Sequence, residues 1–293
     1  MPPKRPTACV KGAPNHRINR KTVVLPLGTA KWRNRFSSMP DLPSSAGTIT
    51  VLSLNLRFGL ADDGPNAWPK RKPALLELLQ RQPADFFCFQ EANDFQISEI
   101  QAHLQNHDVI GQRTPAPPFW QNNVIFYHSS CRCVDRNHFF LSPTPTVPSR
   151  FRDSRWPRQC SIGWFQCRGR TIACANTHLD FDPEVQRRSA AIILDHLSTP
   201  RADVPTLVAG DFNATPQSEC YRVFAEAGFQ KAGPRKCAGT YHGFTGKTNG
   251  ECIDWILYRG GLVSVRTEVI RDCYKGRYPS DHFPVRAEFS WSD

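Results

Sequence analysis

Two short strings, GDFN and SDHFPV, hold the side chains of this chain that are best suited to chemistry. The first places Asp211 beside Asn213, and the second places Asp281 beside His282, each at the edge of an apolar run. A carboxylate with a neighbouring amide or imidazole can bind a hard cation, take a proton from water or hold a phosphoryl oxygen. Together with a Gln-Glu pair and a Thr-His pair earlier in the chain, they indicate metal-dependent hydrolysis of a phosphate ester.

Glu91 is the first candidate for a metal ligand. It ends the apolar run FFCFQ, where a carboxylate has no role in a core, and an exposed charge at a strand end is the alternative. Mg²⁺ favours carboxylate, carbonyl and water oxygens and usually takes only one or two protein carboxylates. Asn55 interrupts the run VLSLNLRF, so its amide oxygen suits a direct or water-mediated contact to the metal, or a bond to a neighbouring loop. Asp281 is expected to complete the metal shell.

His178, Asp211 and Asn213 are candidates for the reaction itself. His178 ends the run IACANTH, where it can donate to a phosphoryl oxygen, although a buried structural imidazole is the alternative. Asp211 and Asn213 follow TLVAG, in which Gly210 permits a close approach of the backbone. Alternate positions on an extended segment point the same way, so we expect both side chains to face one substrate. An Asx-turn is the competing explanation.

Asp254 lies among apolar residues in CIDWILY, where an unpaired carboxylate is costly. Its natural partner is His282, because an aspartate that orients an imidazole and stabilises its charged form is a recurring catalytic device. The sequence contains no G-x-S-x-G string and no phosphate-cradling glycine loop, which argues against a serine nucleophile and a nucleotide-binding P-loop.

The elements that must position these residues alternate between strands and helices. Helices are predicted over residues 68–82, 95–105, 183–197 and 218–227. Strands are predicted over residues 48–58, 85–91, 122–130, 133–142, 160–167, 170–180, 206–213, 252–259, 262–270 and 284–291. Two stretches, 51–91 and 171–213, both run strand, helix, strand, and both place polar residues at the carboxyl ends of strands, where open α/β sheets bind their ligands.

Residues 1–47 differ from the rest of the chain. They hold nine lysines and arginines against the single acid Asp41 and so carry +8 of the net charge of +11. We expect a basic, Pro-rich, disordered arm, which is either a solvated tail or a contact to nucleic acid or another polyanion. Residues 48–293 are expected to form one catalytic domain.

The eleven cysteines include several inside apolar runs, such as Cys88 and Cys174, where Cys acts as a small buried residue. No pair has the C-x-x-C spacing of a zinc site. We interpret the cysteines as free thiols in a reducing compartment. Without an evident signal peptide or membrane span, a cytoplasmic monomer is expected.

Six motifs in order resemble the endonuclease/exonuclease/phosphatase superfamily. They are SLN at 53–55, QE at 90–91, NTHLD at 176–180, GDFN at 210–213, IDWIL at 253–257 and SDHFPV at 280–285. The resemblance covers residues 48–291 and implies a four-layer α/β sandwich, in which two packed mixed β-sheets are flanked by helices. NLRFG, GTYHGFTG and RYPSDHFPV also resemble a bacterial branch of uncharacterised hydrolases.

The resemblance implies a role for each residue. Glu91 binds Mg²⁺ (or Mn²⁺), with Asn55 and Asp281 close to it. Asp211 positions or deprotonates the attacking water, Asn213 holds the phosphate and His178 stabilises the pentacoordinate state. His282 and Asp254 form the acid/base pair. Which of Asp211 and His282 is the base, and whether one metal or two are bound, stay open.

Substrate binding is assigned to Arg158 and Asn123. Arg158 ends the basic segment RFRDSRWPR at 150–158, in which aromatic residues are interleaved, and which contacts substrate phosphates or is a solvated loop. The predicted function is a phosphoesterase in which activated water attacks in line. The alternatives are an endo- or exonuclease on DNA or RNA, and an inactive scaffold that keeps the fold for binding.

Overall fold

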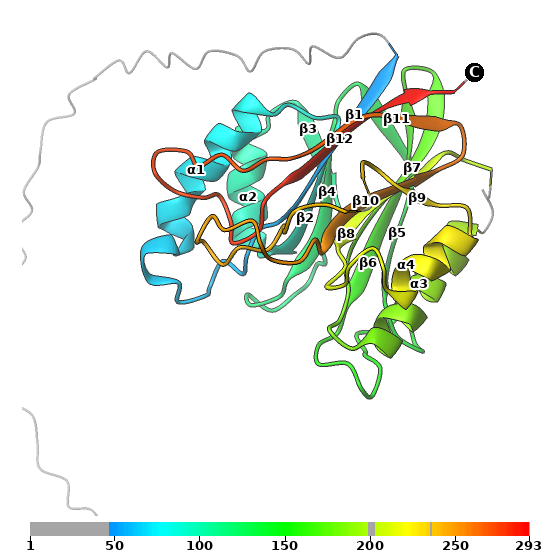
Figure 1. The fold of residues 1–293 in the computed structure, drawn as a ribbon, viewed down its shortest axis with the longest axis horizontal. Coiled ribbons are helices and arrows are strands. Elements are labelled where there is room, and N and C mark those ends of the chain that lie inside the picture. Colours follow the sequence, from blue (N-terminus) through cyan, green and yellow to red (C-terminus); the bar gives the residue numbers. More distant parts are fainter. Residues whose placement is uncertain (1–46, 199–202, 235, 293) are drawn as a thin grey trace, which may run out of the picture. The chain divides into compact units, whose positions relative to one another are not determined.

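The β-branched and aromatic runs of the sequence form the strands of two mixed sheets, seen in a computed structural model (Figure 1). The structure describes residues 47–198, 203–234 and 236–292, all of which lie in one compact unit. The first sheet has six strands in the spatial order β11-β12-β1-β2-β4-β3, and the second has six in the order β5-β6-β7-β8-β10-β9.

The strands of the first sheet are β1 (Thr48–Asn55), β2 (Phe86–Ala92), β3 (His107–Ile110), β4 (Asn122–His128), β11 (Leu262–Val269) and β12 (Val285–Trp291). Those of the second are β5 (Cys131–Phe140), β6 (Gln159–Cys167), β7 (Arg170–His178), β8 (Thr206–Asp211), β9 (Gln230–Lys231) and β10 (Asp254–Arg259). The helices are α1 (Trp68–Arg81), α2 (Asp94–His103), α3 (Pro183–Ser198) and α4 (Glu219–Glu226), with a short 3₁₀ turn at Gly64–Asn66.

The two sheets pack face to face because alternate side chains of each strand point to opposite faces. Val51 and Phe86 of the first sheet lie in one buried cluster with Phe165, Leu207 and Ile256 of the second. Such a layer of interdigitating apolar side chains is the normal core of packed sheets.

Helices cover the outer face of each sheet (Figure 1). Leu75 and Leu78 of α1 are buried against Leu54 and Phe89 of the first sheet. On the other side, α3 and α4 bury apolar residues against β7, β8 and β10. The predicted α/β sandwich of two mixed sheets flanked by helices is confirmed.

The strand–helix–strand units place the polar strand ends at one edge. β1 and β2 are parallel, with Asn55 opposite Gln90, and β7 and β8 are parallel, with His178 opposite Asp211. β10 runs antiparallel to β8, so its first residue, Asp254, also faces Asp211. A Cβ at Gly210 would overlap the carbonyl oxygen of Thr177, which explains the glycine before Asp211.

Some sequence predictions differ from the structure. The short strands β3 and β9 were not predicted, because few residues distinguish them from loops. The predicted arm at residues 1–47 lies, apart from Gly47, outside the described residues, so its boundary and role stay predictions. Among the helices that the structure describes, none is long and apolar enough to cross a membrane.

The prediction of free thiols is wrong for four cysteines. Cys131 is paired with Cys167, and Cys237 with Cys252, in disulfides. Cys131 and Cys167 are direct cross-strand partners of the antiparallel β5 and β6, a register that sequence spacing does not reveal. The free cysteines in the described part of the chain are Cys88, Cys133, Cys160, Cys174, Cys220 and Cys273, and Cys88 and Cys174 are buried as expected.

Lys231 of β9 gives an expected pH dependence of stability. Burial lowers the pKa of Lys231 to about 8, so between pH 8 and its ordinary pKa the unfolded chain binds more protons than the folded one. Stability therefore rises with pH in that window. Urea unfolding at pH 7 and at pH 9.5 measures this effect. Relative to Lys231→Met, the free energy of unfolding of the wild type should rise by about 1–2 kcal/mol between the two pH values. This is less than the full pKa shift would give, because the Lys231 side chain is only half-buried. Parallel pH profiles for the two proteins would contradict this.

Candidate active site

Glu91 reaches the cleft through a distortion of β2. Its backbone has a φ of 58°, and the pairing of β2 with β4 shifts register between Phe89 and Ala92. A left-handed conformation at a non-glycine residue costs free energy and is often found at functional sites. The Glu91 carboxylate accepts hydrogen bonds from Asn55 Nδ2 at 3.2 Å and from the backbone N–H of Phe58 at 2.7 Å.

Asn55 joins the two halves of the site. Its Nδ2 also donates to Asp211 Oδ2 at 3.0 Å, so one amide group bridges Glu91 and Asp211. The oxygen of the Asn55 side chain accepts from the backbone N–H of Arg57 at 2.8 Å. In this arrangement the amide nitrogen, and not the expected oxygen, faces the carboxylates, and the role of Asn55 as a metal ligand stays a prediction.

Asp211 lies at the centre of the buried network. Its Oδ1 accepts from the backbone N–H of Asn213 at 2.9 Å, and its Oδ2 lies 3.4 Å from His178 Nε2 and 3.8 Å from His282 Nε2. Burial, followed by the neighbouring charge of Asp254, raises the pKa of Asp211 to about 7. A carboxyl group with this pKa can both accept and release a proton at neutral pH.

The backbone of Asn213 does not have the extended conformation that was expected. β8 ends at Asp211, and Asn213 has a φ of 47° in a turn that the Asp211 side chain stabilises, so an Asx-turn forms in place of the expected extended segment. Asn213 Nδ2 donates to the carbonyl oxygen of Leu179 at 3.0 Å and lies 3.1 Å from His178 Nε2. Burial, with the positive charges of Arg158 and His282, holds the pKa of His178 well below its usual value, so this imidazole is neutral.

Asp254 and His282 form the expected pair. His282 Nδ1 lies 2.9 Å from Asp254 Oδ2, and both residues are buried. Burial alone would lower the pKa of His282, but the negative charges of Asp254 and Asp211 outweigh it and raise the pKa to about 10. The imidazole is therefore positively charged at neutral pH, and both ring nitrogens carry a proton.

Asp281 faces away from the imidazole next to it in the chain. Its Oδ2 lies 3.8 Å from Arg57 Nε, and its Oδ1 accepts from Ser280 Oγ at 3.1 Å. Ser280 Oγ also lies 2.6 Å from the carbonyl oxygen of Asn55, which ties this loop to the end of β1. Asp281 thus lies close to the strand ends that hold the other predicted metal ligands.

Two groups of side chains offer donor atoms to a cation. Asp211, Asp254 and His282 present atoms within 4.8 Å of one another. However, the charges of Asp254 and Asp211 raise the pKa of His282 to about 10, so a metal at Nε2 would have to displace a tightly held proton. Glu91 lines an open cavity and offers a carboxylate, the donor that Mg²⁺ prefers. Glu91 therefore suits a divalent metal better than the charged His282 does.

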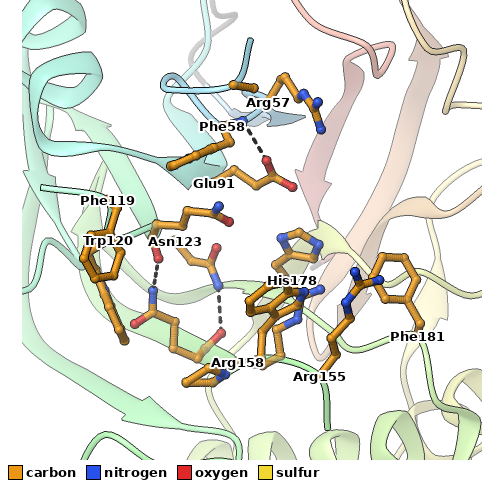
Figure 2. Close-up of a pocket in the computed structure, with 15 residues that line it drawn as sticks. Arg57, Phe58, Glu91, Phe119, Trp120, Asn123, Arg155, Arg158, His178 and Phe181 are labelled. Atoms are coloured by element: carbon orange, nitrogen blue, oxygen red, sulfur yellow. Dashed lines mark hydrogen bonds between the residues drawn. The ribbon is translucent and has the colours of Figure 1, made fainter. Parts of the chain in front are cut away.

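A cavity of about 540 Å³ opens beside this network. Glu91, His178, Arg158 and Asn123 all line it (Figure 2). The substrate-binding role of Arg158 and Asn123 stays a prediction. Arg158 is buried, and its Nε has no hydrogen-bond partner among the described residues; its closest acid is Asp180, at 4.0 Å. Asn123 Nδ2 donates to the carbonyl oxygen of Gln159 at 2.8 Å, so part of its hydrogen-bonding capacity is used within the fold.

Several residues that shape the site had no role in the sequence-based prediction. Arg57 lines the cavity and forms an ion pair with Asp63 at 2.9 Å. The hydroxyl of Thr240 accepts from the backbone N–H groups of Ile253 and Asp254 and so positions the start of β10. Arg57 belongs to the NLRFG motif, which was a signal of its importance; Thr240 had no such signal.

The arrangement of the site and of the sheets agrees with comparisons to known proteins. The profile of the Endonuclease/Exonuclease/phosphatase family matches residues 52–282, and the chain belongs to this family. Its members are hydrolases that act on phosphoester bonds. Human Nocturnin is similar at 24% identity, covering 86% of this chain and 68% of Nocturnin.

Solved bacterial structures resemble the chain as well. A family protein from Bacteroides thetaiotaomicron has 28% identity and a TM-score of 0.78, covering 84% of this chain and 98% of its own. A mannosyl-6-phosphatase from the same organism has 28% identity and a TM-score of 0.76, covering 83% and 100%. The zebrafish TDP2 bound to a single-stranded DNA product, at 17% identity and a TM-score of 0.68, shares the fold over 83% of this chain and 99% of its own.

Proposed function

We propose that this protein is a Mg²⁺-dependent phosphoric ester hydrolase in which water, activated by Asp211, attacks phosphorus in line. One observation carries the proposal: Glu91, Asn55, Asp211 and His282, from four separate segments, are linked by consecutive contacts of 3.2, 3.0 and 3.8 Å. A binding scaffold has no need of such a network of buried charges, which is costly to desolvate.

The protonation states favour Asp211 as the base. Its pKa of about 7 lies near the working pH, whereas His282, with a pKa of about 10, already carries its proton. A general base works best when its pKa is close to the ambient pH. His282 then acts as a charged donor, held in place by Asp254.

The distances also indicate which side of phosphorus the water and the leaving group occupy. In an in-line attack, the water and the leaving oxygen stand on opposite sides of phosphorus. Asp211 Oδ2 and His282 Nε2 are 3.8 Å apart, so both act on the side of the attacking water. Neither of them lines the cavity, which opens instead beside Glu91, His178 and Arg158. The leaving group therefore occupies the cavity.

The charges beside the cavity suit a phosphate. Arg158 offers a buried guanidinium with an unused donor, and Asn213 and His178 stand next to Asp211. Guanidinium groups bind phosphate oxygens with strong, directional hydrogen bonds. Glu91 and Asp281 would hold the metal, which when bound polarises the phosphoryl oxygens and stabilises the charge on the leaving oxygen.

Metal removal tests this proposal. We expect EDTA to abolish hydrolysis of phosphate monoesters and diesters, and Mg²⁺ or Mn²⁺ to restore it. Glu91→Gln should raise the Mg²⁺ concentration needed for half-maximal rate about 10-fold or more, because a charged ligand is lost. Glu226→Gln removes an exposed carboxylate on α4 and serves as the matched control. Full activity in EDTA would contradict the metal-dependent mechanism.

A nuclease acting on DNA or RNA is the second candidate, favoured by the basic residues 1–47. Activity on polymers alone would favour this candidate, and loss of that activity on deleting the arm would assign the arm to substrate binding.

The cytoplasmic location and the monomeric state also stay predictions. The two disulfides weigh against a reducing compartment, since disulfides persist mainly in oxidising ones.

A further inference from the structure

Exposed aromatic side chains gather at the candidate active site. The large aromatic residues that are exposed in the described part of the chain are Phe119, Trp156, Phe181 and Tyr241, at 64%, 52%, 58% and 49%. The first three line the cavity, and the ring of Tyr241 lies 5.0 Å from that of His282. Exposed apolar groups that concentrate at one place mark a binding surface.

The rings form walls on two sides of the cavity. Figure 2 shows Phe119 and Trp120 on one side, Phe181 and Arg155 on the other, and Glu91 between them. Phe119 and Trp120 come from the loop before β4, and Phe181 from the segment that follows β7. A group that enters the cavity between these walls therefore meets aromatic side chains from both.

Hydrogen bonds hold these walls in place. Asn93 Nδ2 donates to the carbonyl oxygen of Trp120 at 2.8 Å. On the opposite wall, Asp180 Oδ2 accepts from Ser154 Oγ at 2.7 Å and from the backbone N–H of Arg155 at 3.1 Å. The walls therefore need little ordering when a ligand binds, which lowers the entropic cost of binding.

Arginines stand beside the rings. The guanidinium of Arg155 lies 5.4 Å from the Trp156 ring, and that of Arg158 lies 5.8 Å from the Phe181 ring. Rings combined with cations suit a flat π-system joined to an anion.

We propose that the cavity binds a nucleobase and that the substrate is a nucleotide-sized phosphate ester. The proposal rests on the hydrolase function above and names its leaving group. The phosphate lies at the end of the cavity formed by His178 and Arg158, and the base stacks between the aromatic walls. A volume of about 540 Å³ is in the range of pockets that enclose a small organic ligand.

Paired substrates test this inference. The kcat/KM of the 2′-, 3′- and 5′-monophosphates of adenosine is measured beside that of ribose 5-phosphate and a hexose 6-phosphate. Stacking of a base on aromatic side chains is worth about 5- to 150-fold in binding. We expect at least one adenosine monophosphate to exceed both sugar phosphates about 10-fold or more.

Trp156→Ala and Phe181→Ala identify the residues involved. Each should reduce the preference for the nucleotide over ribose 5-phosphate about 5-fold or more, and Trp156→Phe should restore most of it. Val265→Ala removes an exposed apolar side chain from β11, outside the cavity, and should leave the ratio as in the wild type.

Direct binding separates this inference from the proposed function. Calorimetry on the Asp211→Asn protein compares adenosine 5′-monophosphate with ribose 5-phosphate without any hydrolysis. Tighter binding of the nucleotide, lost in the double variant with Trp156→Ala, supports the base subsite even if no substrate is hydrolysed. Equal binding of the two, a preference for the hexose phosphate, or binding only of single-stranded polymer would overturn it. Hydrolysis that prefers sugar phosphates would refute the base subsite while leaving the phosphoesterase intact.

Discussion

Asp211→Asn is expected to lower kcat by about 10³-fold or more, with a much smaller change in KM. The asparagine keeps the shape of the side chain but can no longer take a proton from water, and loss of a general base typically costs about 10²- to 10⁴-fold. Burial and the Asp254 charge raise the pKa of Asp211, so the charged form is disfavoured in the fold. The variant should therefore unfold at the same temperature as the wild type or a higher one.

The measurement pairs kinetics with thermal unfolding, so that a loss of activity is not mistaken for a loss of structure. Asp195→Asn, which changes an exposed aspartate on α3, is the matched control and should retain wild-type kinetics. A folded Asp211→Asn protein with a kcat within about 10-fold of the wild type would remove Asp211 from the role of base.

Asp254→Asn is expected to lower kcat by about 10²- to 10⁴-fold and to shift the pH dependence of the rate. Among the negative charges that raise the pKa of His282 to about 10 against the effect of burial, that of Asp254 has the largest effect. Without that charge His282 loses its proton at a lower pH. The alkaline limb of the profile should therefore move toward neutral pH.

Rates of both proteins from pH 6 to 10.5 test this expectation. Because the Asp254 charge also raises the pKa of Asp211, the acid limb of the variant should move to lower pH as well. Two profiles of the same shape, scaled only in height, would show that Asp254 does not act through these two groups. Asp272→Asn alters an exposed aspartate in the loop after β11 and is a suitable control.

Most elements of the fold were predictable because local pattern and tertiary context agree. The apolar runs ending at Asn55, Glu91 and His178 formed strands, and the periodic stretch around Leu75 and Leu78 formed α1. The strands β3 and β9 were missed, since they are short and are stabilised by pairing with β4 and β10 and not by their own sequence.

The candidate site was predictable as a set of residues, but not as a geometry. GDFN and SDHFPV identified Asp211 and His282, because charges at the ends of apolar runs have no use in a core. The proximity of the predicted residues follows from the parallel register of β7 with β8 and the antiparallel register of β10 with β8. Asn213 entered the site through a left-handed Asx-turn, which had been kept as the alternative to an extended segment.

By itself, the sequence determined the order of strands and helices and the side chains able to do chemistry, because both depend on residue type and local spacing. Only the tertiary structure decided which carboxyl group has a pKa near 7, which cysteines pair, and which aromatic rings share a cavity. These properties depend on burial, on strand register and on charges far apart in the chain. For example, Asn55 and Asp211 are 156 positions apart in the sequence but 3.0 Å apart in space.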